Sequence, residues 1–180
     1  MADPNTGQLS TLLRNIKANL EDSTNYAAVT SRVKKVYITP VFYMPEKTTP
    51  CAVIVPGVGS VVDEGSYLTE ISRVVSVYVA TRLHAEPTGS KGLIGNITAI
   101  EGLESICRRV RKALNRSDPY GAGKPSGATY TTMTQCDFAG YQGEDEPTIE
   151  NTYGLFNPTQ GLPALVIRME FLYRYFETRE

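Results

Sequence analysis

The closing segment PALVIRMEFLYRYFETRE, residues 163–180, has the clearest strand pattern in the chain and limits its possible folds most. Side chains on a strand alternate between two faces, so every second residue shares a face. One face is apolar and consists of Ile167, Met169, Phe171, Tyr173 and Tyr175. The other mixes charge with large apolar groups and consists of Arg168, Glu170, Leu172, Arg174 and Phe176. We therefore expect a sheet with a core on one face.

Other segments supply further strands. Residues 67–81 alternate with Ile71, Arg73, Val75, Val77 and Val79 on one face. Residues 31–45 are rich in β-branched and aromatic side chains, and their prolines favour an edge or bent strand. The apolar run at 50–57 predicts a buried strand followed by a turn and an acidic loop, and residues 128–138 predict another strand.

Two segments have the spacing of amphipathic helices. In the first, Leu9, Leu12, Leu13, Ile16 and Leu20 form one apolar stripe, with Asp3 or Thr6 as the expected cap and an end near residues 22–25. In the second, Thr98 and Glu101 have the spacing of a capping box, and apolar residues continue to Leu114. The order of elements predicts an α+β fold in which both helices pack on one face of a largely antiparallel central sheet.

The length of 180 residues predicts one domain, 1–180, with polar loop insertions near 117–127 and 139–161. A formal charge of -1 provides no net field to hold a polyanion or an anionic membrane. The chain shows no signal-peptide pattern at its start and no apolar run long enough to span a bilayer, so we expect synthesis in the cytoplasm. Three widely spaced cysteines, Cys51, Cys107 and Cys136, favour a reducing compartment.

The segment GAGKPSG, residues 121–127, resembles a phosphate-binding loop only superficially. The earlier glycine of that motif would fall at Asp118, Pro125 separates Lys124 from Ser126, and the segment follows a predicted helix instead of a strand. We therefore expect a connecting loop and no nucleotide cofactor. We also expect no metal site, because the chain has one histidine and its cysteines are far apart.

The sequence contains only weak candidates for catalytic residues. Any Ser-His-Asp or Cys-His set must use His84, and no nucleophile elbow accompanies it. Acidic pairs occur at Asp63–Glu64 and at 144–146, where a solvated loop explains them equally well. The basic run 108–112 compensates a helix dipole, although it could also contact phosphates. We expect no catalytic residues.

The face of the last strand opposite the apolar one is the candidate subunit interface: Arg168, Glu170, Leu172, Arg174 and Phe176. Protein interfaces favour such a combination of aromatic residues and arginine. The alternative is that a helix of the same chain covers this face.

Several segments together resemble the tail terminator proteins of long-tailed bacteriophages. They are the opening helix LSTLLRNIKANL, the segment PCAVIVPGVGSVVDEG, the strand ISRVVSVYVATRL, the basic helix GLESICRRVRKALN and the closing strand LVIRMEFLYRY. The resemblance covers most of the chain and consists of a pattern of elements without a chemical signature.

The resemblance implies a structural virion protein of the tail or neck that forms a homohexameric ring. Such a ring ends growth of the tail tube and forms the head-joining surface, so its partners are the tail tube protein and a neck or head-completion protein. DNA passes through the channel without specific binding. Alternatives are another neck or head-closure adaptor protein, a small α+β enzyme using His84 or the acidic loops, and a nucleic-acid-binding module using the basic run 108–112.

Overall fold

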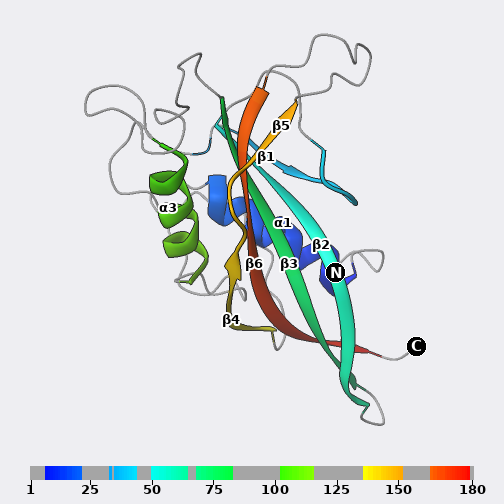
Figure 1. Cartoon of the computed structure of the whole chain (residues 1–180). Coiled ribbons are helices and arrows are strands. Elements are labelled where there is room, and N and C mark those ends of the chain that lie inside the picture. Colours follow the sequence, from blue (N-terminus) through cyan, green and yellow to red (C-terminus); the bar gives the residue numbers. More distant parts are fainter. Residues whose placement is uncertain are drawn as a thin grey trace.

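The computed structural model of the chain describes residues 7–21, 33, 35–43, 50–64, 68–82, 102–115, 136–151 and 163–178. These residues form two helices and a six-stranded sheet (Figure 1). The elements are α1 (Gln8–Glu21), β1 (Lys35–Ile38), β2 (Cys51–Glu64), β3 (Leu68–Arg82), α3 (Leu103–Asn115), β4 (Cys136–Glu144), β5 (Thr148–Asn151) and β6 (Pro163–Thr178).

The sheet has the order β1-β2-β3-β6-β4. Strand β5 is outside this order and also pairs with β6. Only the β1–β2 pair is parallel among these strand pairs, and the others are antiparallel. β3 pairs with β6 from Leu68↔Thr178 to Arg82↔Ala164, so two long strands form the centre of the sheet. The α+β class predicted from the sequence is confirmed, including its largely antiparallel sheet.

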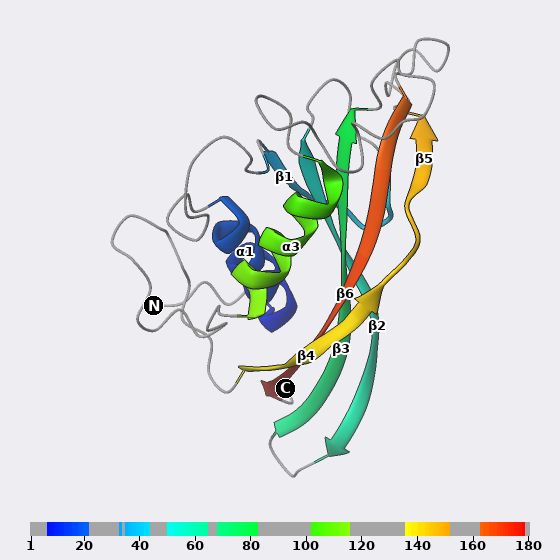
Figure 2. The same cartoon turned by 60° about the vertical axis from the view of Figure 1, so that its left-hand side comes forward.

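Both helices lie on the same face of the sheet, and the main core fills the space between them and the strands (Figure 2). The apolar face of β6 is buried there as predicted, with Met169, Phe171, Tyr173 and Tyr175 at 0% exposure. Val75, Val77 and Val79 of β3 join them. Leu12, Ile16 and Leu20 of α1 and Leu103, Ile106 and Val110 of α3 complete this layer, which confirms the two apolar stripes.

Both helices begin at positions that differ from the predicted ones. Gly7 and Gly102 directly precede α1 and α3, and their carbonyl groups accept hydrogen bonds from the N–H groups of Thr11 and Ile106 at 3.2 Å. A glycine at this position leaves the first amide groups open to water, so a side-chain cap is not required. α1 ends at Glu21, just before the predicted end. The predicted caps Asp3, Thr6, Thr98 and Glu101 lie outside the described residues.

Two predicted loops are partly strand. The turn and acidic loop expected after residue 57 instead continue β2 to Glu64, and register shifts between Pro56 and Gly59 and between Val61 and Asp63 accommodate the irregular sequence. The polar loop expected at 139–161 contains the end of β4 and all of β5. Gly140 and Gly143, at φ 144° and 143°, provide the backbone freedom for the register shifts of β4.

Several further sequence predictions, for loops, a strand and a histidine, concern other parts of the chain. The segment GAGKPSG, the insertion near 117–127, His84, residues 128–135 and residues 152–161 all lie outside the described residues. The edge position predicted for the strand within 31–45 is confirmed, because β1 is the outermost strand on one side among the strands that the structure describes.

Candidate functional site: the open face of the sheet

The five residues of the candidate subunit interface lie on the face of β6 that points away from α1 and α3. Their exposure is intermediate for Arg168, Glu170, Leu172 and Phe176 and high for Arg174, whereas the alternating residues of β6 are buried. Neither described helix covers this face (Figure 2). We call these five residues, with Ser72, Val74 and Ser76 of β3, the open face.

Register pairs divide the open face into a charged and an apolar half. In the apolar half, which is the lower one, Leu172 of β6 pairs with Val74 of β3, and Arg174 pairs with Ser72. This half therefore places apolar side chains beside one exposed guanidinium. Glu170 pairs with Ser76, whose side chain is 8% exposed. Cross-strand neighbours on one face are within contact distance, so Leu172 and Val74 form a continuous apolar surface.

The upper end of the same face is covered by the segment that follows β1. Phe42 stacks on Tyr78 of β3 with ring centroids 4.0 Å apart and an interplanar angle of 16°. Together with Tyr37 they pack against a second buried cluster. Its members are Cys51, Ala80, Ala164 and Val166. A contact with another molecule through this face would therefore use its lower part, below Tyr78.

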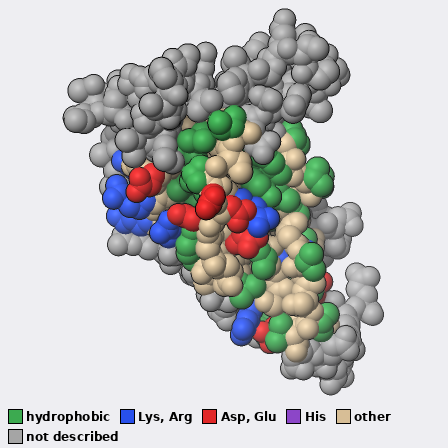
Figure 3. All heavy atoms as spheres, in the orientation of Figure 1, with side chains coloured by type: hydrophobic (Ala, Val, Ile, Leu, Met, Phe, Trp, Pro, Cys, Tyr) green, Lys and Arg blue, Asp and Glu red, His purple; other side chains and the backbone are tan. Residues whose placement is uncertain are grey.

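A group of charged residues lies between these two parts. Arg168 Nε is 2.9 Å from Asp145 Oδ2, and Arg168 Nη2 is 3.4 Å from Glu170 Oε1. The Nε–Asp145 contact is an ion pair without an aligned N–H···O hydrogen bond. A hydrogen bond with Tyr78, followed by the charges of Glu170 and Asp145, raises the pKa of Arg168. In Figure 3, acidic and basic side chains gather in the middle of this view, with hydrophobic side chains above and below.

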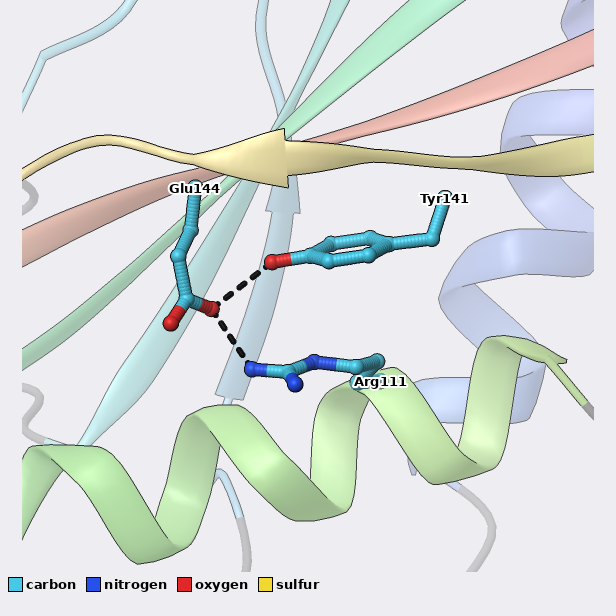
Figure 4. Close-up of polar contacts among 3 residues, drawn as sticks. All are labelled: Arg111, Tyr141 and Glu144. Carbon is cyan, nitrogen blue, oxygen red and sulfur yellow. Dashed lines mark hydrogen bonds and ion pairs between the residues drawn. The ribbon is translucent and has the colours of Figure 1, made fainter.

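A second polar group joins α3 to β4 on the helix side of the sheet. Glu144 Oε2 accepts hydrogen bonds from Tyr141 Oη at 2.7 Å and from Arg111 Nη2 at 2.8 Å (Figure 4). The Arg111 guanidinium lies over the Tyr141 ring, 4.8 Å from its centroid. Burial, and then the hydrogen bond to Glu144, raises the pKa of Tyr141. We call Arg111, Tyr141 and Glu144 the α3–β4 clamp.

The geometry of the clamp indicates a structural role. Tyr141 also packs on the core against Phe171, with centroids 5.3 Å apart. Its hydroxyl donates to the carboxylate that pairs with Arg111, so each charged group has a partner within the chain. The Arg111 and Glu144 side chains are 37% and 38% exposed, and ion pairs in such positions contribute little to stability.

The thiols among the described side chains are unsuited to nucleophilic catalysis. Cys51 and Cys107 are free and buried. Burial raises the pKa of Cys51 to about 12. It also raises the pKa of Cys107 to about 12, where Glu144 adds to the increase and Arg111 opposes it. A thiol is nucleophilic as the thiolate, so both groups remain inert near neutral pH.

The acidic residues 144–146 have different surroundings and do not form one site. Glu144 belongs to the clamp, Asp145 pairs with Arg168, and Glu146 is exposed. Within the described residues, no cluster of three or more histidine, cysteine or acidic side chains could hold a metal ion. Neither α1 nor α3 is long and apolar enough to cross a membrane.

The basic run 108–112 is divided between the exposed surface of α3 and the clamp. Arg108 and Lys112 are exposed and one helical turn apart, whereas Arg111 turns inward to the clamp. The sequence did not indicate that Arg111 and Glu144 would meet, because they are 33 positions apart and no local pattern links them. It also did not single out Tyr141.

No protein-family model matches the chain, and no curated protein matches it.

Proposed function

We propose that this chain is a structural virion protein, a tail terminator whose copies form a homohexameric ring at the end of a phage tail tube. The ring would stop tube growth and form the head-joining surface. DNA would pass through its channel without specific binding, and the near-neutral charge is compatible with this because each phosphate contact adds affinity. The protein would be made in the host cytoplasm and function in the virion.

The observation that carries the proposal is the open face. Helices α1 and α3 bury one side of the sheet, whereas the other presents Leu172, Val74 and Phe176 beside Arg174. A surface of aromatic, aliphatic and arginine side chains is suited to contact between proteins. The resemblance in the order of elements supports the assignment to the tail terminator class.

Electron microscopy of the purified full-length chain, alone and mixed with phage tail tubes, tests the proposal. We expect discrete rings in solution or rings capping tube ends, with a particle mass six times that of the chain. A chain that forms no rings and leaves tube ends bare would contradict it. Rings that bind only a head connector would instead favour a head-closure adaptor.

A further inference from the structure

The lower part of the β2–β3 hairpin extends beyond the ends of both helices (Figure 2). We call its residues 57–64 and 68–72 the arm. Four of the eight clearly exposed large apolar side chains in the described part of the chain belong to it: Val58 at 87%, Val61 at 56%, Val62 at 50% and Leu68 at 37%. Exposed apolar side chains gathered on one projecting element indicate a contact with another molecule.

The base of the arm is held in place by one arginine. Arg73 Nη1 donates to the carbonyl oxygen of Gly57 at 2.7 Å, and Arg73 Nε donates to Tyr175 Oη at 3.1 Å. These bonds connect β2, β3 and β6 where the arm leaves the core. The arm is therefore tied to the sheet, so little ordering entropy would be lost when it binds.

The outer edge of the arm is unsuited to adding another strand. β1 pairs with β2 only from Cys51 to Ile54, so β2 beyond this point is an edge among the described strands. Pro56 and two register shifts interrupt that edge, and such features prevent regular strand addition. The arm would therefore bind through its side chains instead of its main chain.

Charge indicates which surface the arm fits. Residues 57–72 contain three acidic residues, Asp63, Glu64 and Glu70, and no lysine or arginine. Helix α3 contains four basic residues and one acidic residue, and its Arg108 and Lys112 are exposed one turn apart. In Figure 1 the arm extends toward the lower right, away from α3, which lies on the left beside the sheet. A chain of net charge -1 with opposite charges separated in this way is complementary to a second copy of itself.

We propose that the arm of one copy packs against the exposed Arg108–Lys112 side of α3 in a second copy. The two surfaces differ, so the contact is head-to-tail, and head-to-tail contacts generate rings when the rotation closes. The negative charge of the arm complements the positive charge of Arg108 and Lys112, while the arm valines cover the aliphatic stems of these basic side chains. This inference rests on the proposed ring and adds a second contact between copies to the one proposed for the open face.

A charge exchange tests the contact in the full-length chain. The arm variant is Asp63→Lys with Glu64→Lys, the helix variant is Arg108→Glu with Lys112→Glu, and a third chain combines all four changes. Sedimentation velocity over a concentration series at low salt measures self-association. We expect each reversal to weaken self-association about tenfold or more and the combined chain to recover most of it. Added salt should weaken the wild-type contact.

Controls separate this contact from folding and from the proposed function. Arg14→Glu, an exposed change on α1, should leave self-association unchanged. Val58→Ser with Val62→Ser tests the apolar part, should fold normally and should also weaken self-association. Wild-type self-association that neither reversal changes, or that the combined chain does not recover, would overturn the inference while leaving the ring proposal intact. A wild-type chain without salt-sensitive self-association would also overturn it, and tube-end capping would then test the proposed function separately.

Discussion

At the scale of single residues, the α3–β4 clamp shows how a tyrosine on an outer strand helps to hold a helix. Tyr141 packs on the core with its ring and donates its hydroxyl to Glu144, which also binds Arg111. The ring position also places Arg111 in cation–π distance, 4.8 Å from the centroid. One side chain therefore links packing, hydrogen bonding and charge between two elements.

Removing the Tyr141 hydroxyl should lower stability by a small but measurable amount. Tyr141→Phe keeps the ring and loses one hydrogen bond to a carboxylate, so we expect the free energy of unfolding to fall by about 0.5–1.5 kcal/mol. Urea unfolding monitored by circular dichroism measures this. Tyr43→Phe, at a position 41% exposed, is the control and should be neutral. Equal effects of the two variants would show that the clamp bond contributes nothing.

The buried thiol of Cys107 should make stability fall at alkaline pH. Its pKa is raised from 9.0 to about 12 in the folded chain, so the folded state keeps a proton that the unfolded state loses. The contribution is complete below pH 9 and decreases as pH rises toward 12, by up to about 1.4 kcal/mol per pH unit. Cys107→Ala should reduce this slope in urea unfolding between pH 9 and 11. Identical slopes would contradict the shift.

At the scale of elements, the register shift in β2 depends on close approach between two strands. A Cβ built on Gly57 would lie 2.6 Å from the carbonyl oxygen of Val74 on β3. This oxygen belongs to the backbone of a paired strand, so it cannot rotate away. The Gly57 carbonyl also accepts from Arg73, which ties the same position to the base of the arm.

Gly57→Ala should therefore destabilise the hairpin. We expect a loss of about 1–3 kcal/mol in the free energy of unfolding, because the strands must separate locally to admit the methyl group. Thermal and urea unfolding provide the measurement. Arg14→Ala, at an exposed position on α1, is the control. A Gly57 variant as stable as the control would show that β2 and β3 are more loosely packed at this point.

At the scale of the whole molecule, the sheet has one face for folding and another available for assembly. Leu172 lies on the open face beside Val74, away from the core that stabilises the chain. Leu172→Asp should leave the fold intact and weaken self-association about 30-fold or more, the effect of an interface hot spot.

Particle mass and circular dichroism of the same sample measure assembly and folding separately. Arg14→Asp on α1, on the opposite side of the sheet, is the control and should assemble normally. If the Leu172 variant forms the same particles as the wild type, the open face does not take part in assembly.

The sequence alone was sufficient for the fold class and for the assignment of residues to faces. Alternation in β6 and β3 and the helical spacing in α1 and α3 are local periodicities, and burying the apolar side of each element leads to one two-layer arrangement. The predicted interface residues on β6 accordingly lie opposite the core. The same reasoning was wrong about residues 58–64, 139–144 and 148–151, because glycines, proline and acidic residues indicate loops when considered locally.

The extent of those strands and the polar contacts depend on the tertiary structure, which brings distant parts of the chain together. β5 and the polar end of β4 become strands because the long edge of β6 supplies hydrogen-bond partners, and β2 extends because β3 does the same. The clamp connects positions 33 residues apart, and Arg73 reaches Tyr175 across 102 residues. Local sequence patterns do not indicate which distant residues form such pairs. Periodicity therefore determined which side of each element is buried, and chain-distant pairing determined how far each strand runs.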